Sequence, residues 1–195
     1  MKTCAIISSI LGLSYCLPAA SLPDIVWQTD PQPNGVLDVI FSADGQRLVS
    51  ANGLAKIWDI TGNLVRTFSI PNDDVAAVAV SPDGLRLAGG GGSGGFRIWN
   101  VSDGSVLWVA PTGGSGQGVQ DLAFSPDGTR LAWCGRSIGI SNSTNLYEGL
   151  LLDEVHSQGV QGLAFSPDGS LLGFYGTDGR AASASSPMAR YCGDL

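Results

Sequence analysis

The sequence predicts an all-β protein built from four repeats of one unit, and three observations support this fold class. Four similar segments start 39, 44 and 41 residues apart, and they are VLDVIFSADGQRLVSA from Val36, VAAVAVSPDGLRLAGG from Val75, VQDLAFSPDGTRLAWC from Val119 and VQGLAFSPDGSLLGFY from Val160. Each segment places two apolar stretches, typical of strands, on either side of a Ser-Pro-Asp-Gly-type turn. The first two units continue into two further β-rich stretches. Four short strands in about 40 residues match one blade of a β-propeller.

The turn between the first two strands of each unit has a local explanation. Pro fixes φ at the second turn position, Asp bonds to the nearby backbone, and Gly accepts a positive φ. We therefore predict structural rather than catalytic roles for the turn carboxylates, which are Asp44, Asp83, Asp127 and Asp168.

The remaining strands follow in order along each unit. Second strands are predicted to begin at Leu48, Leu87, Leu131 and Leu172. Third strands are predicted at AKIWD, 55–59, and FRIWN, 96–100, and fourth strands from Leu64 and Val106. The stretch AASASSPMA, 181–189, has little strand character, so we expect an irregular last blade.

These elements divide the chain into four repeats within residues 24–185. Their approximate bounds are 32–70, 71–110, 115–153 and 156–185. The stretch DIVWQTD, 24–30, resembles the fourth-strand stretch SVLWVAP, 105–111, and is a candidate strand for closing the last blade. Residues 186–195 are expected to form an irregular tail. Four blades are at the low end of the range of about 4–8 in closed propellers, so the propeller is either small or partial.

The units resemble WD (Trp-Asp) repeats, through FSPDG after the first strand and through Trp58-Asp59 and Trp99-Asn100 at the end of the third. The resemblance implies a β-propeller that serves as a non-catalytic interaction platform. In that family a His, a Ser or Thr, the Trp and an Asp form a hydrogen-bonded set within a blade. Only the fourth unit has the His, at His156, and that unit has Ala184 at the Trp position. We therefore expect the set to be absent from every blade.

The first 20 residues read as a secretory signal peptide. Lys2 precedes an apolar run, 4–17, which ends in Pro18, Ala19 and Ala20. The run is shorter than the about 20 residues that a membrane-spanning helix needs. A lipoprotein signal using Cys16 is a minor alternative. The sequence thus predicts a secreted or periplasmic protein, without a membrane span after cleavage.

Export permits a disulfide between the two cysteines that remain, Cys134 and Cys192. A buried free thiol at Cys134 is the alternative, since it lies in an apolar stretch. The sequence leaves both interpretations open.

Charge and motif spacing argue against several kinds of function. The net charge of −7 opposes binding to nucleic acid. Two G-x-S-x-G matches, 91–95 and 135–139, lie between predicted strands and lack the strand-to-helix turn of a nucleophile elbow. No spacing typical of a metal site is present. We therefore predict no catalytic residue, cofactor or metal.

Two groups of residues are candidates for binding. Asp73 and Asp74 make one loop before a first strand acidic, which favours a partner with a basic patch, and His156 lies in an equivalent loop. Asp38 and Asp121 occupy the third position of their first strands, nearest the expected propeller axis. They would line the channel and hold a cation or basic group, or else accept backbone hydrogen bonds from an adjacent blade.

The sequence therefore predicts an exported, non-catalytic scaffold for an unidentified protein partner. Two alternatives are an incomplete part of a larger propeller and a propeller region that accompanies a hydrolase or lyase. Open blade edges would also allow self-association.

Overall fold

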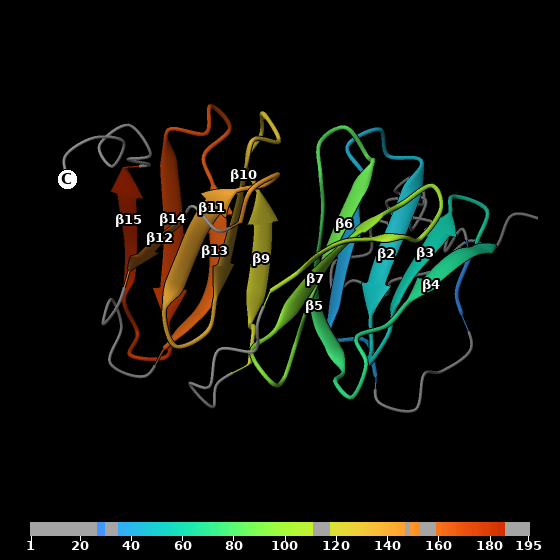
Figure 1. The fold of residues 1–195 in the computed structure, drawn as a ribbon, viewed down its shortest axis with the longest axis horizontal. Coiled ribbons are helices and arrows are strands. Elements are labelled where there is room, and N and C mark those ends of the chain that lie inside the picture. Colours follow the sequence, from blue (N-terminus) through green and yellow to red (C-terminus); the bar gives the residue numbers. More distant parts are fainter. Residues whose placement is uncertain (1–26, 30–34, 111–117, 147–148, 153–158, 186–195) are drawn as a thin grey trace, which may run out of the picture.

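The computed structural model describes residues 27–29, 35–110, 118–146, 149–152 and 159–185. These residues form fifteen strands in four antiparallel sheets that stand side by side (Figure 1). The all-β propeller-type architecture predicted from the repeats is thus confirmed, and each sheet is one blade.

Each blade follows the strand order of the sequence. Blade one contains β1 (Asp38–Phe41), β2 (Arg47–Ala51), β3 (Ala55–Asp59) and β4 (Leu64–Phe68). Blade two contains β5 (Val75–Val80), β6 (Arg86–Gly91), β7 (Phe96–Asn100) and β8 (Val106–Val109). Blade three contains β9 (Asp121–Phe124), β10 (Arg130–Cys134), β11 (Ile138–Asn142) and β12 (Gly149–Leu152). Blade four contains β13 (Val160–Phe165), β14 (Leu171–Gly176) and β15 (Ala181–Ser185).

The last blade is more regular than its sequence suggests. β15 pairs with β14 without interruption, from Leu171 opposite Ser185 to Tyr175 opposite Ala181. Its small side chains have little intrinsic strand preference, but the backbone ladder to β14 supplies the pairing. Blade four has three strands within the described residues, one fewer than each other blade.

The turn after each first strand is fixed by one serine and one aspartate, as blade one shows. The Ser42 hydroxyl donates to Asp44 Oδ1 at 2.5 Å and accepts from the Arg47 backbone N–H at 3.0 Å. Asp44 also accepts from the Gln46 N–H at 3.0 Å, and Gly45 has φ of 67°. The same hydroxyl–carboxylate contact recurs in the other blades, at Ser81–Asp83, Ser125–Asp127 and Ser166–Asp168. The predicted local role of these aspartates therefore has a direct geometric basis.

The hydrophobic core lies between the blades. We call the side of a blade that faces the preceding blade its near face and the opposite side its far face. Large apolar residues lie on both faces, such as Leu87 on the near face of blade two and Ile98 on its far face. Between blades two and three, for example, Leu122 and Leu131 on the near face of blade three cluster with Ala79 and Ala88 on the far face of blade two.

Backbone hydrogen bonds repeat at each junction between blades. The N–H of the residue that opens a repeat donates to a carbonyl at the end of the second strand of the preceding blade, or one to two residues beyond it. The three bonds are Val75 N to Gly53 O at 2.9 Å, Val119 N to Gly91 O at 2.9 Å and Val160 N to Gly135 O at 2.7 Å. Because they involve backbone atoms, they fix the spacing between blades independently of side-chain packing.

An arginine at the start of the second strand adds a side-chain link at two junctions. Arg130 Nη2 donates to Gly169 O at 2.6 Å, and its guanidinium lies 5.3 Å from the centre of the Phe165 ring. Arg86 does the same one junction earlier, with Gly128 O at 2.9 Å and the Phe124 ring at 5.3 Å. The guanidinium thus stacks on the last residue of the next first strand and caps the turn that follows.

The four blades form an open arc. The first strands β1, β5, β9 and β13 neighbour one another in that order. Blades one and four lie at opposite ends of the molecule in Figure 1, so the sheets do not close into a ring.

Candidate interaction surface

The predicted acidic loop connects β4 to β5, and its two carboxylates differ in their surroundings. Asp73 accepts the Ser93 N–H at 3.1 and 3.2 Å and the Asp74 N–H at 2.9 Å. It therefore ties the loop to the glycine-rich turn between β6 and β7. Asn72 supports this path with φ of 60°, a conformation that Asn tolerates better than most residues. Asp74 is exposed, which leaves its carboxylate accessible from solvent.

A cavity of about 280 Å³ lies beside this loop. Its wall combines Asp73 and Ser93 with Phe96 and Arg97 of β7 and with Val109 of β8. The Arg97 Nε is buried and makes no hydrogen bond within the part of the chain that the structure describes. The cavity therefore combines a carboxylate, a guanidinium and an apolar wall.

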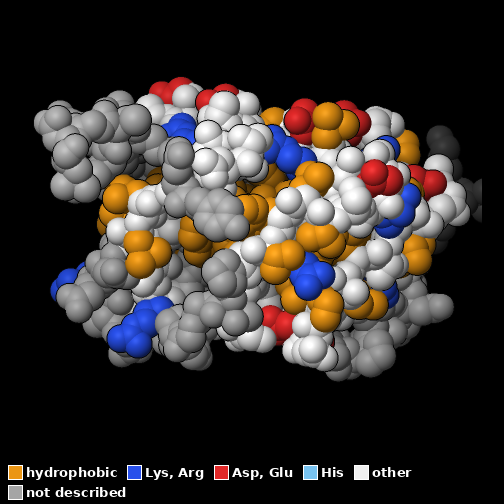
Figure 2. Space-filling model, in the orientation of Figure 1, with side chains coloured by type: hydrophobic (Ala, Val, Ile, Leu, Met, Phe, Trp, Pro, Cys, Tyr) orange, Lys and Arg blue, Asp and Glu red, His pale blue; other side chains and the backbone are white. Residues whose placement is uncertain are grey.

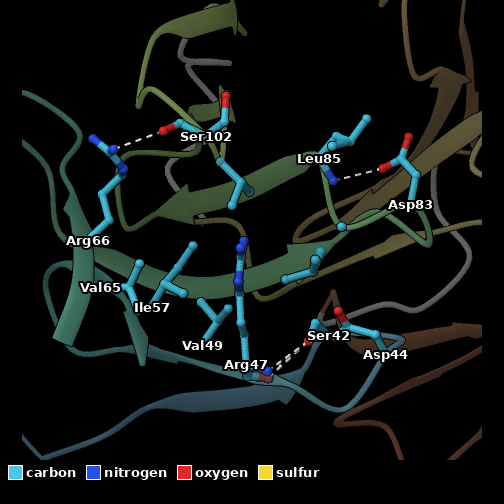
Figure 3. Close-up of a pocket in the computed structure, with 13 residues that line it drawn as sticks. Ser42, Asp44, Arg47, Val49, Ile57, Val65, Arg66, Asp83, Leu85 and Ser102 are labelled. Atoms are coloured by element: carbon cyan, nitrogen blue, oxygen red, sulfur yellow. Dashed lines mark hydrogen bonds between the residues drawn. The ribbon is translucent and has the colours of Figure 1, made fainter. Parts of the chain in front are cut away.

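A second cavity, of about 270 Å³, lies between blades one and two (Figure 3). Arg47 extends into its centre from β2, and Arg66 borders it while donating to Ser102 O at 2.9 Å. At the two later junctions a phenylalanine ring lies under the equivalent arginine, but blade two has Val80 at that position. The smaller side chain leaves the space open beside Arg47.

The turn carboxylates mark one rim of the arc as acidic. Figure 2 shows acidic side chains gathered along the edge where Figure 1 places the turns after β5 and β9. The Ser125 hydroxyl is the main cause that lowers the pKa of Asp127 to about 2, and Ser166 acts in the same way on Asp168. The pKa values of Asp44 and Asp83 are lowered by equivalent serine hydroxyls. This rim therefore stays negatively charged well into the acid range.

Asp38 and Asp121 link first strands of neighbouring blades. Asp38 Oδ2 accepts the Val78 N–H at 2.9 Å, and Asp121 Oδ2 accepts the Leu163 N–H at 2.9 Å. This geometry agrees with the alternative in which these carboxylates accept backbone hydrogen bonds from an adjacent blade. Burial raises the pKa of Asp121, and the charge of Asp38 adds to that effect. Binding of a cation or basic group there stays a prediction.

The WD-type hydrogen-bonded set is partly present, which corrects the expectation that every blade lacks it. In blade one the Trp58 Nε1–H donates to the Ser50 hydroxyl at 3.0 Å. In blade two Gly89 stands at the serine position, and a Cβ there would lie 2.8 Å from the Trp99 ring.

The signature carboxylate Asp59 caps its turn through Thr61 and Asn63, which lower its pKa to about 2. Asn100 plays the same part through Ser102.

Blades three and four place their aromatic side chain on the second strand instead. Trp133 of β10 covers Gly139, where a Cβ would overlap its ring, and Ser141 stands at the position of Trp58. Trp133 also packs against Phe96 of blade two, with ring centroids 5.0 Å apart. In blade four Phe174 and Ala184 show the same exchange. The signal in the sequence is the pair LAWCG and LLGFYG, in which an aromatic residue replaces the serine.

Several predicted features fall wholly or partly outside the described residues. Residues 1–20, His156, Cys192 and the tail 186–195 lie there. Cys134 is 1% exposed in β10, and burial raises the pKa of its thiol to about 12. Its disulfide with Cys192 stays a prediction.

Of the candidate closing strand, residues 27–29 are described, and Trp27 packs against Trp58 of blade one with ring centroids 6.0 Å apart.

Both G-x-S-x-G matches span turns between antiparallel strands, from β6 to β7 and from β10 to β11, and include one or two residues of those strands. Among the described residues, no three acidic, cysteine or histidine side chains gather as they would around a metal ion. The described part of the chain also contains no helix of the length and hydrophobicity needed to cross a membrane.

Comparison with known proteins identifies the repeats. The family model described as "WD domain, G-beta repeat" matches residues 26–59, 62–100 and 150–182, which together make up more than half of the chain. The match leaves out residues 101–149, which include most of the third unit, and in that unit Ser141 stands at the tryptophan position.

Relatives share about a third of the aligned residues. The apoptotic protease-activating factor 1 of Rattus norvegicus is 34% identical over 146 residues, which cover 62% of this chain and 11% of that protein. The small ribosomal subunit protein RACK1y of Oryza sativa is 34% identical over 96 residues, which cover 49% of this chain and 26% of that protein. Eukaryotic translation initiation factor 3 subunit I of Aspergillus fumigatus is 33% identical over 96 residues, which cover 48% of this chain and 25% of that protein. The chain thus spans about a quarter of these relatives' length or less.

Proposed function

Because the chain belongs to the family of WD domains with G-beta repeats, we propose that it is an exported, non-catalytic scaffold that binds a basic patch on a protein partner. WD repeats support a role in protein–protein interaction. The names of two relatives, a small ribosomal subunit protein and a subunit of initiation factor 3, describe components of larger assemblies.

The choice of partner rests on Asp74, which is exposed and follows Asp73 of the cavity wall in the chain. Its loop is held in place by the bonds from Asp73 to the turn after β6, so little ordering is needed when a partner binds. A lysine or arginine of the partner would pair with Asp74, while a neighbouring side chain enters the cavity. The acidic rim formed by the turn aspartates also favours a positively charged partner, through long-range attraction.

Affinity capture from the medium of the producing cells tests this proposal. The bait is the protein itself, compared with Asp74→Lys and with Asp103→Lys, a matched control in the exposed turn between β7 and β8. A partner should be recovered by the protein and by the control, and lost with Asp74→Lys. A set of captured proteins that does not depend on Asp74 would contradict the proposed site.

Export is supported by the charged start, the short apolar run and the small residues at 18–20. Expression of the complete coding sequence in a secreting host should give a product in the medium whose first residue is Ser21 or Leu22. An intracellular product that still begins at Met1 would refute the localisation.

A further inference from the structure

The near face of blade one is exposed, although the equivalent residues of the other blades are buried. Val36 is 53% exposed, whereas the residues that open the later repeats, Val75, Val119 and Val160, are 0 to 4% exposed. Val39 is 55% exposed, while its equivalents Val78, Leu122 and Leu163 are 2 to 9% exposed. Blade one thus carries the side chains of an inter-blade junction without a blade in front of it.

The far face of blade four is its counterpart. At the two later junctions the arginine that begins the second strand stacks on the phenylalanine that ends the next first strand. Blade four has Leu171 at the arginine position, 44% exposed, and blade one has Phe41 at the phenylalanine position, 64% exposed. If blade four preceded blade one, an apolar pair would replace the cation–π contact. The two exposed side chains therefore match each other across the ends of the arc.

The backbone at the two ends matches in the same way. At each junction the residue that opens a repeat donates its N–H to a carbonyl at or just beyond the end of the second strand of the preceding blade. Gly176 occupies the carbonyl position in blade four, equivalent to Gly91 and Gly135. Val36 occupies the donor position in blade one. A contact between the ends would add a fourth bond of the series, from Val36 N–H to Gly176 O.

Trp27 indicates what kind of blade fits in front of blade one. Phe68, which ends the fourth strand of blade one, packs against Trp99 of blade two at 5.5 Å between ring centroids. Trp27 packs against Trp58 in the corresponding way, at 6.0 Å. It thus takes the place of a fourth strand from a preceding blade. A complete blade would bring its own fourth strand to that place, whereas blade four has three strands within the described residues.

We propose that blade four of a second copy packs on the near face of blade one, with the reciprocal contact at the other end. Phe41 then meets Leu171 of the second copy, and Trp27 lies beside the three-stranded blade of that copy. Two arcs of four blades close an eight-bladed ring, which is within the range of about 4–8 blades in closed propellers. A third copy would exceed that range, so the ring closes at two copies.

The test is the mass of the protein in solution, measured by light scattering and sedimentation equilibrium. The expected mass is twice that of the single chain, which is 20.1 kDa before any processing. Phe41→Asp and Leu171→Asp should each weaken dimerisation by at least about 30-fold, because each places a charge against an apolar side chain in both contacts. Leu107→Asp, at an exposed position of β8 on neither end face, is the matched control and should leave the dimer intact. Far-UV circular dichroism and the unfolding midpoint of each variant check that it folds.

A complementary pair separates a direct contact from a general loss of solubility or folding. Phe41→Lys and Leu171→Glu, each alone, should give monomers, and the double variant should recover the dimer through an ion pair. A monomeric wild type, larger assemblies, or an effect at only one of the two ends would overturn the proposal. So would failure of the double variant to associate although it is folded.

Discussion

Replacing Arg130 by Ala should destabilise the junction between blades three and four by about 2–3 kcal/mol. The substitution removes a charged hydrogen bond to Gly169 O, at 2.6 Å, and such bonds contribute about 1.5–3 kcal/mol. It also removes the contact with the Phe165 ring at 5.3 Å, for which about 0.5–1 kcal/mol is typical of an incompletely buried site. We take a total below the sum of the upper limits because Arg130 is only half-buried.

Arg47 provides a matched control at the same position of blade one. Its guanidinium extends into the cavity of Figure 3 and donates no hydrogen bond to another described residue. Val80 replaces the phenylalanine under it, so no ring contact is lost. Arg47→Ala should therefore change the free energy of unfolding by less than about 0.5 kcal/mol.

Urea unfolding of both variants measures this difference through the transition midpoint and slope. Because each blade contacts only its neighbours, the loss at Arg130 should fall mainly on blade four. Amide hydrogen exchange in β13 and β14 should then accelerate by at least about 10-fold relative to exchange in blade one, following the free-energy change. Equal shifts for Arg130→Ala and Arg47→Ala, or uniform acceleration of exchange over all blades, would refute the reasoning.

Three further results are expected. Trp58→Phe should cost about 1 kcal/mol in urea unfolding, because it removes the N–H that bonds Ser50 but keeps an aromatic ring; no loss would mean that this bond contributes nothing. Asp127 should titrate with a pKa of about 2 by NMR, and this pKa should rise toward 3.8 in Ser125→Ala. Because the pKa of Asp127 is lower in the folded protein than in the unfolded chain, its contribution to the free energy of unfolding is present above pH 3.8 and is lost as the pH falls toward 2. The Cys134 thiol, with its pKa raised to about 12, should resist iodoacetamide at neutral pH until the protein unfolds, and lack of labelling after unfolding without reductant would indicate the predicted disulfide instead.

The sequence predicts best what depends on contacts within a few residues. The turn from Ser42 to Arg47 closes through one hydroxyl, one carboxylate and backbone N–H groups, all within six residues. The four copies of this turn can therefore be located in the sequence, and the strands on either side of each copy assigned, from local chemistry alone. The first strands of blades one and three begin two residues later than their apolar patterns, at Asp38 and Asp121. At those positions the carboxylates bond to the neighbouring blade, which a single repeat does not reveal.

Contacts between repeats were harder to predict, because they depend on which residues face each other once the blades stack. Arg86 lies far along the chain from Phe124, and its role is seen only when β6 and β9 belong to adjacent blades. The exchange of the aromatic side chain to Trp133 shows the same limitation. Its ring fills space that is free because Gly139 lies opposite on β11. A search for tryptophan at one fixed position misses this compensation.

At the candidate site the sequence predicts the acidic charge of the loop, but it does not show that its two aspartates have different roles. Asp73 and Asp74 both make the loop acidic, but Asp73 is engaged with the Ser93 N–H and only Asp74 is exposed. A binding residue must be accessible, and accessibility depends on the glycine-rich turn that follows β6. A Cβ at Gly91 would overlap the Asp73 carboxylate, so this glycine permits the close approach that withdraws Asp73 from solvent.

The proposed ring and the proposed binding function would reinforce each other. Each blade contributes one turn aspartate to the acidic rim, and its serine partner keeps the pKa of that aspartate low. In one arc this gives four carboxylates along an edge, whereas a closed ring of two copies would present them around a full circle and would duplicate the Asp74 loop. A partner that carries two basic patches could then bind both copies, so its affinity would exceed that for one arc through a higher effective concentration. Phe41→Asp should therefore weaken binding of such a partner, although Phe41 lies on the end face rather than in the acidic loop.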